Sequence, residues 1–163
     1  MRSVRVATAS LAALLWVVLT MPAGAAEAPA EIRSLFERYI DAWNRGDLLS
    51  IGGEMYRPPV YVFEATETRP LSTPQDVVDL LSPLRAGLDE SGFSHSTIRD
   101  VSVCELGGGL ALASLHYERF DRDGNTMDEA VLASAYVVRR YHDGWHLVAH
   151  LVQDQPRTFT CPD

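Results

Sequence analysis

The chain has 163 residues, with 14 Lys and Arg against 22 Asp and Glu, and a formal net charge of −8 at pH 7. A chain this acidic repels phosphate backbones, so we expect no nucleic acid among its partners. The length is that of one ordinary domain, and the sequence shows no repeat and no low-complexity tract.

The first 26 residues are predicted to be a secretory signal peptide. Two early arginines precede the apolar run LAALLWVVL at 11 to 19, and small residues follow at Ala23 and Ala25 in the A-x-A spacing of a cleavage site. The run is short for a membrane span of ~20 residues, so we expect no stable membrane anchor. We expect cleavage after Ala25 or Ala26, and cleavage after Ala26 would leave 27 to 163 as a single secreted or periplasmic domain.

After the signal peptide, the sequence predicts three helices, with a strand and a short return strand between the second and the third. Residues 31 to 44 carry the apolar stripe of an amphipathic helix. A short helix capped by Asp47 follows, and 60 to 65 read as a strand with a short return strand near 70 to 72. A longer helix begins at Pro74. Pro83 lies inside it and is expected to kink or split it. The stripe of the first helix is formed by Ile32, Leu35, Phe36, Tyr39, Ile40 and Trp43.

The remainder of the chain is predicted to be strand. Residues 96 to 105, 110 to 120, 126 to 141 and 145 to 153 alternate or run apolar, and short glycine-containing links separate them. Such links join neighbouring strands into an antiparallel meander. Helices that precede a meander of strands indicate the α+β class.

Two motifs carry a resemblance to a known family. AWNRGD at 42 to 47 closes the first predicted helix, and DGWHLVAHLVQD at 143 to 154 ends the meander. Together with the proline-capped helix between them, they resemble the nuclear-transport-factor-2-like superfamily in its SnoaL-like branch, over about residues 31 to 154. The resemblance implies a cystatin-like fold, in which a cone-shaped, curved, mostly antiparallel sheet wraps around the N-terminal helices and encloses a pocket. It does not fix the function, because this fold hosts many activities.

The resemblance includes ketosteroid isomerases, whose site can be compared residue by residue. Tyr39 matches the pocket tyrosine of that branch, five residues before the asparagine of a similar N-x-G-D. The position of the branch's catalytic aspartate holds Phe63, with Glu64 beside it, and its second acid falls near Tyr136 or Val137. Since one of three roles is filled, the resemblance gives weak support for a steroid-type isomerase.

The last hairpin determines which residues would face the pocket. Its turn fits a two-residue or a three-residue loop. We predict the three-residue loop, which pairs Val137 with Ala149, because it gathers apolar side chains on one face. His146 and His150 would then point outward and have no functional role. The inward face would consist of Ala135, Val137, Leu147, Ala149 and Leu151.

Candidate catalytic residues and ligands follow from this arrangement. Tyr39, Tyr117 and Glu129 are the candidates for catalysis, because a carboxylate facing an apolar cone can become a general acid or base. Alternatively, Glu129 is solvated and pairs with Arg119. No metal or cofactor is predicted, since His146 and His150 would lie about 13 Å apart along one strand, too far to share a zinc ion. The predicted pocket is lined by Tyr39, Trp43, Phe63, Tyr117, Val137, Ala149 and Leu151.

Cys104 and Cys161 are predicted to form a disulfide, because an exported protein with two cysteines commonly pairs them. The alternative is a buried free Cys104 and a free Cys161 in the tail.

Three functions remain open from the sequence. The preferred one is an exported domain that binds a small, largely apolar molecule in the cone. The second is a cofactor-independent isomerase, dehydratase or cyclase, so whether the protein is an enzyme stays open. The third is a structural or protein-binding role, with a homodimer formed through the outer face of the sheet.

Export can be tested by fusing residues 1 to 30 to a reporter that is active only outside the cytoplasm. We expect activity, and a mature N-terminus at Ala26 or Glu27, because the leader has the charge, length and cleavage site of a signal peptide. N-terminal sequencing of the exported product makes the measurement. A membrane-bound product that keeps Met1 would contradict the prediction.

Overall fold

The computed structural model describes residues 27–128, 130–153 and 161. The predicted signal peptide and Glu129 lie outside the described residues. The elements in chain order are α1 (Glu27–Arg45), α2 (Leu48–Ser50), the π-helical turn η1 (Ile51–Met55), β1 (Tyr56–Phe63), β2 (Thr68–Leu71), α3 (Pro74–Glu90), β3 (Phe93–Gly107), β4 (Leu110–Asp121), β5 (Leu132–Tyr141) and β6 (Gly144–Leu151).

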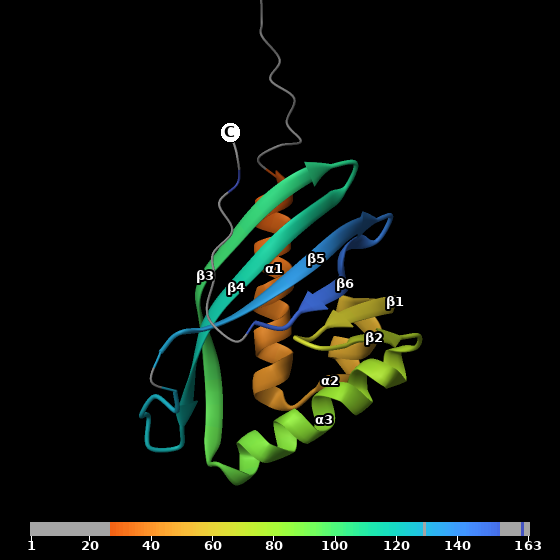
Figure 1. The fold of residues 1–163 in the computed structure, drawn as a ribbon. Coiled ribbons are helices and arrows are strands. Elements are labelled where there is room, and N and C mark those ends of the chain that lie inside the picture. The colour runs from red at the N-terminus through yellow and green to blue at the C-terminus, as the bar shows by residue number, and fades with distance from the viewer. Residues whose placement is uncertain (1–26, 129, 154–160, 162–163) are drawn as a thin grey trace, which may run out of the picture.

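The strands form one sheet in the order β2-β1-β6-β5-β4-β3. All neighbouring strands are antiparallel except β1 and β6, which are parallel. The sheet curves around α1, and α3 lies across the lower end of the molecule (Figure 1). This arrangement confirms the predicted α+β class, with N-terminal helices and a curved, mostly antiparallel sheet.

The apolar stripe of α1 forms the centre of the core. Ile32, Leu35 and Phe36 are at most 1% exposed, and they belong to the same buried cluster as Val138 and Leu147 of the sheet. The face of the sheet that packs on α1 is called the inner face, and the opposite one the outer face. Burying one fixed stripe of α1 thus sets which strand residues must point inward.

Asn44 of the AWNRGD motif ties the end of α1 to β3. Its Nδ2 donates a hydrogen bond to the Ser96 carbonyl oxygen (3.0 Å), and its Oδ1 accepts one from the Ser96 backbone N–H (2.7 Å). One side chain therefore satisfies both backbone groups of Ser96, much as a neighbouring strand would. The motif's asparagine positions a strand.

Of the kink or split expected at Pro83, the split does not occur, because α3 remains one helix. The predicted cap is present: the Thr73 hydroxyl accepts a hydrogen bond from the Asp76 backbone N–H, and the Asp76 carboxylate accepts one from the Thr73 N–H. Buried Leu81 anchors the helix before the proline, and after it Arg85 donates a hydrogen bond to the Trp43 carbonyl oxygen. Tertiary contacts on both sides therefore offset the backbone hydrogen bond that the proline removes.

The strand predicted at 126 to 141 is shorter, because β5 begins at Leu132. The side chain of Asp121 accepts hydrogen bonds from the backbone N–H groups of Asp123 and Asn125. These bonds close a local turn after β4 in place of a continuous ladder. Of the antiparallel pairing expected between 110 to 120 and the start of 126 to 141, one isolated bridge forms, between Phe120 and Thr126.

β6 contains a bulge at Val148, which differs from the unbroken alternation predicted for this strand. Val137 pairs with Ala149, as predicted, but the next residue of β5, Val138, pairs with Leu147. Val148 is therefore an extra residue without a partner in β5. A bulge of this kind reverses the alternation of side chains between the two faces of the strand.

The bulge changes which residues of β6 face inward. Leu147, before the bulge, lies in the core on the inner face, and His150, after it, lies on the inner face as well. Val137 and Ala149 form a correctly predicted pair, but that pair lies on the outer face. The inward assignment of Ala135, Val137, Ala149 and Leu151 was wrong, because it assumed an unbroken alternation from Trp145 to Leu151.

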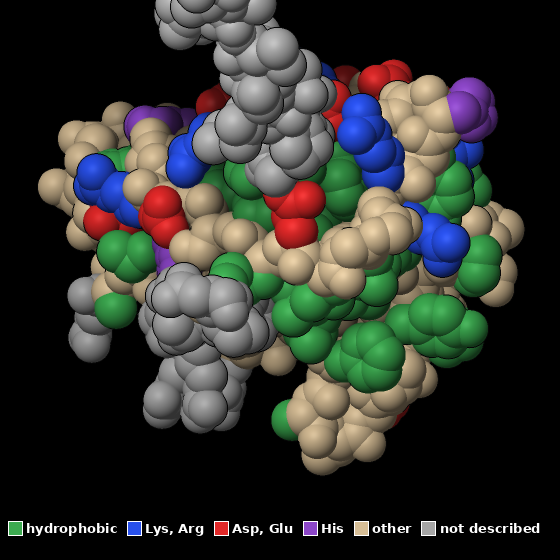
Figure 2. Space-filling view, turned by 90° about the horizontal axis from the view of Figure 1, so that it is seen from above, with side chains coloured by type: hydrophobic (Ala, Val, Ile, Leu, Met, Phe, Trp, Pro, Cys, Tyr) green, Lys and Arg blue, Asp and Glu red, His purple; other side chains and the backbone are tan. Residues whose placement is uncertain are grey.

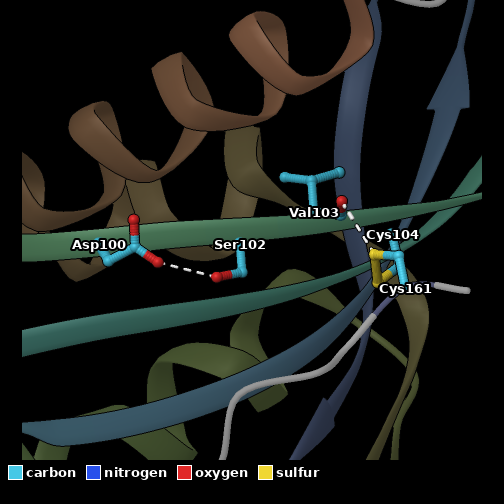
Figure 3. Close-up of a disulfide and its surroundings, with 5 residues drawn as sticks. All are labelled: Asp100, Ser102, Val103, Cys104 and Cys161. Carbon is cyan, nitrogen blue, oxygen red and sulfur yellow. Dashed lines mark hydrogen bonds between the residues drawn. A yellow bond between two sulfur atoms is a disulfide. The ribbon is translucent and has the colours of Figure 1, made fainter. Parts of the chain in front are cut away.

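The predicted disulfide between Cys104 and Cys161 is present, with the Cα atoms 5.4 Å apart. Cys104 lies on β3, and Cys161 Sγ is 3.5 Å from the Val103 carbonyl oxygen (Figure 3). Nearby on the same strand, the Ser102 hydroxyl donates a hydrogen bond to Asp100 (2.8 Å). The bond holds Cys161 against β3.

Removing this crosslink should lower the stability substantially. The bond closes a loop across a sequence separation of 57 residues, for which the chain-entropy model gives about 4 kcal/mol. We expect Cys161→Ser to lower the free energy of unfolding by roughly that amount, or less if the reduced chain retains structure. Urea unfolding of the variant beside oxidised and reduced wild type makes the comparison. Two free thiols per chain in unfolded, unreduced wild type would refute the bond.

Candidate ligand-binding cavity

A cavity of about 440 Å³ lies between the C-terminal half of α1, α3 and the inner face of the sheet. Its size falls in the range of small-molecule sites, roughly 300–1,000 Å³. Most of its surface is apolar, with polar groups contributed by a few side chains. The lining residues are Tyr39, Ile40, Trp43, Leu81, Pro83, Leu84, Gly87, Leu88, Ser96, Leu115, Tyr117, Arg119, Ser134, Tyr136 and His150.

The structure divides the predicted pocket residues into two groups. Tyr39, Trp43 and Tyr117 line the cavity. The other four lie elsewhere, because the bulge and the register of β1 turn them to the outer face. Phe63, for example, pairs with Leu151 and is 43% exposed. The outer-face group is Phe63, Val137, Ala149 and Leu151.

His150 lies against Tyr136 on the inner face. The two rings are stacked, with centroids 4.7 Å apart and planes inclined by 14°. Burial lowers the pKa of His150 to about 4, because desolvation disfavours the imidazolium form. The imidazole is therefore neutral at pH 7, with one ring nitrogen able to donate a hydrogen bond and the other able to accept one.

Three tyrosine hydroxyls form a buried hydrogen-bonded group beside the cavity. Tyr39 is hydrogen-bonded to Tyr56 and Tyr136, and the latter is also hydrogen-bonded to Ser134. Burial is the main cause that raises the pKa of all three phenols well above the usual value. These side chains consequently remain protonated and can offer hydrogen bonds, but they do not act as bases near pH 7.

Among the uncharged side chains that line the cavity, two polar atoms are buried without a hydrogen-bond partner among the described residues: Ser96 Oγ and His150 Nδ1. The backbone of Ser96 is fixed by Asn44, and the ring of His150 is fixed by its stacking on Tyr136. A buried polar atom without a partner costs about 1–3 kcal/mol. Both atoms are therefore groups that a bound molecule would satisfy.

Arg119 is the one charged side chain among the described residues that line the cavity. Its Nε lies 3.1 Å from a carboxylate oxygen of Asp128. This contact is an ion pair rather than a well-directed hydrogen bond, since neither atom has a hydrogen-bond partner among the described residues. The positive charge at the edge of the cavity thus has a counter-charge from the protein itself. Glu129, which was predicted either to take part in catalysis or to pair with Arg119, lies outside the described residues.

The remaining histidines lie outside the cavity. His146 is buried at the end of the last hairpin, where its Nε2 is 3.1 Å from Arg57 and 3.2 Å from Asp143. Tyr141 packs edge-on against its ring. These contacts connect the hairpin to β1, so His146 has a structural role, whereas the predicted outward position of His150 was wrong.

The described residues contain no group of three or more His, Cys, Asp or Glu side chains placed to hold a metal ion. Within the same residues, no helix combines the length and apolar character needed to cross a bilayer.

A family model described as NTF2-like protein (DUF6841) matches residues 30–155. The chain belongs to this NTF2-like family. The resemblance read from AWNRGD and the final hairpin is thereby confirmed. No match was found among curated proteins.

Solved structures show the same fold. An NTF2-like protein with a cystatin-like fold from Novosphingobium aromaticivorans has 22% identity and a TM-score of 0.61, over 77% of this chain and 80% of that one. A proposed dehydratase of the NTF2-like family from Streptomyces avermitilis has 18% identity and a TM-score of 0.56, over 77% and 94%. A proposed aromatic-ring hydroxylase from Novosphingobium aromaticivorans has 15% identity and a TM-score of 0.56, over 77% and 87%. At these identities the likeness concerns the fold alone.

The buried neutral His150 should make this NTF2-like protein less stable in mild acid. Its folded pKa of about 4 lies below the usual 6.5, so the unfolded chain binds the proton first as the pH falls. The stabilisation is present above pH 6.5 and is lost below it, by about 2 kcal/mol between pH 7.5 and 5. His150→Phe should show a correspondingly smaller loss in urea unfolding, whereas His142→Phe, at an exposed site, should match wild type. Equal pH dependence in all three proteins would contradict the assignment.

Proposed function

We propose that the protein binds a small, largely apolar molecule in the cavity between α1, α3 and the inner face of the sheet. The observation that carries this proposal is an apolar cavity with a few preorganised polar groups, which is the usual composition of a small-molecule site. Leu84 supports it, because this leucine lines the cavity and is still 57% exposed. A ligand would cover apolar surface that the protein alone leaves in water.

Catalysis is the second candidate, as a cofactor-independent isomerase, dehydratase or cyclase. The convergence of His150 and Tyr136 on the cavity, with Tyr39 and Tyr117 nearby, favours it. The low pKa of His150 weighs against efficient proton abstraction near pH 7, because a base works best when its pKa is close to the working pH. Binding is therefore the function that the described residues support better.

A homodimer through the outer face is a third candidate that is compatible with either of the others. Tyr61 and Phe63 on β1 are 47% and 43% exposed on that face. Viewed from the N-terminal end of α1, hydrophobic side chains gather on one side of the molecule (Figure 2). We also propose that the protein works outside the cytoplasm, since the N-terminal sequence and the disulfide both favour an oxidising compartment.

Binding can be tested by a fluorescence titration with pyrene, an uncharged apolar probe. Gly87 lies on the cavity side of α3, and a Cβ there would meet no atom within 4 Å. Gly87→Phe should fill the cavity and weaken pyrene binding about tenfold or more. Gly87→Ala is the matched control, since it removes the same helical glycine but adds little volume.

Both variants should fold at least as stably as wild type, because glycine is unfavourable in a helix by about 1 kcal/mol. Unfolding curves check this point. If pyrene bound all three proteins equally, the binding site would lie elsewhere. If wild type bound no pyrene, the proposal of an apolar site would fail.

A further inference from the structure

The polar groups of the cavity carry information about the chemical class of its ligand. We infer that the ligand is uncharged and bears an alcohol or carbonyl oxygen, which Ser96 Oγ or His150 Nδ1 contacts. This inference rests on the proposed binding function and narrows it. It excludes two common classes of apolar ligand, the carboxylic acids and the amines.

The charges around the cavity argue for an uncharged ligand. Tyr39 and Tyr136 keep their protons, and His150 is neutral. The one charged lining residue among those described, Arg119, already has Asp128 as its counter-charge at 3.1 Å. An ion brought into this apolar space would lose its hydration without gaining an unpaired opposite charge, which is costly.

The two unpartnered atoms of uncharged side chains argue for an oxygen on the ligand. Ser96 is 3% exposed, and neither its hydroxyl nor His150 Nδ1 has a partner among the described residues. A hydroxyl can donate or accept, and a neutral imidazole offers one donor and one acceptor. An alcohol or carbonyl group matches either atom, whereas a pure hydrocarbon would leave both without hydrogen bonds.

The anchors are rigid, so an oxygen would be recognised at a defined position. Asn44 holds both backbone groups of Ser96, and Tyr136 holds the plane of the His150 ring. The two anchors lie on β3 and β6, which are separated in the sheet by β4 and β5. One oxygen therefore contacts one anchor, and a molecule with two separated oxygens could contact both.

The test compares four probes of similar size on wild type: pyrene, 1-pyrenemethanol, 1-pyrenecarboxylate and 1-pyrenemethylamine. At pH 7.5 the first two are uncharged, the third is an anion and the fourth a cation. We expect the alcohol to bind at least tenfold more tightly than either ion. An acid or amine that binds as tightly as the alcohol would overturn the inference, while pyrene binding would still support the site itself.

The double variant Ser96→Ala/His150→Phe tests the anchors. It removes both polar atoms but keeps an aromatic ring on Tyr136 and changes no charge, since His150 is neutral. We expect the preference for the alcohol over pyrene to fall about three- to tenfold, the equivalent of one net hydrogen bond. The single variants then show which anchor holds the oxygen. An unchanged preference would overturn the inference.

A matched control pair lies on β3, the strand that carries Ser96. Ser94 and His95 are exposed, and His95 stacks on Phe120 with centroids 5.0 Å apart and planes at 13°, much as His150 stacks on Tyr136. Ser94→Ala/His95→Phe makes the same chemical changes outside the cavity and should leave the preference as in wild type. The comparison of charged and uncharged probes needs only wild type, so it stays decisive if the double variant does not fold.

Discussion

One extra residue in β6, Val148, determines the character of the cavity. Before this bulge Leu147 completes the core against α1, and after it His150 faces the cavity. An unbroken strand would place these two side chains on opposite faces, because they are three positions apart. The bulge allows one short strand to supply an apolar residue to the core and a polar one to the site.

Much of the fold could be predicted from sequence because its signals are local and periodic. The stripe of α1, the cap at Thr73 and the disulfide partners follow from spacing and composition, and each is present. The bulge gives no such signal: Leu147, Val148 and Ala149 are all apolar, so their order does not reveal where the alternation reverses. Tertiary packing against α1 determines where the alternation reverses, and the wrong inward assignment of Val137, Ala149 and Leu151 follows from that reversal.

In the site, too, residues with a local sequence signal could be predicted, and residues placed by long-range contacts could not. Tyr39 and Trp43 could be identified because they lie on the predicted stripe of α1. Ser96 could not, because its place beside the cavity depends on Asn44, which is 52 positions away in sequence. The resulting site is apolar and uncharged apart from a compensated Arg119, with its polar atoms held in fixed positions. These properties suit recognition of a neutral molecule better than chemistry that requires a strong base.

The position of His150 on the inner face can be measured by NOE spectroscopy. The rings of His150 and Tyr136 are 4.7 Å apart, and those of Tyr136 and Phe36 are 5.3 Å apart. We expect cross-peaks that connect His150 to Tyr136 and Tyr136 to Phe36 of α1. Cross-peaks from the His150 ring to Tyr61 and Phe63, with no path to α1, would instead place the imidazole on the outer face and refute the bulge as the origin of the cavity's polar lining.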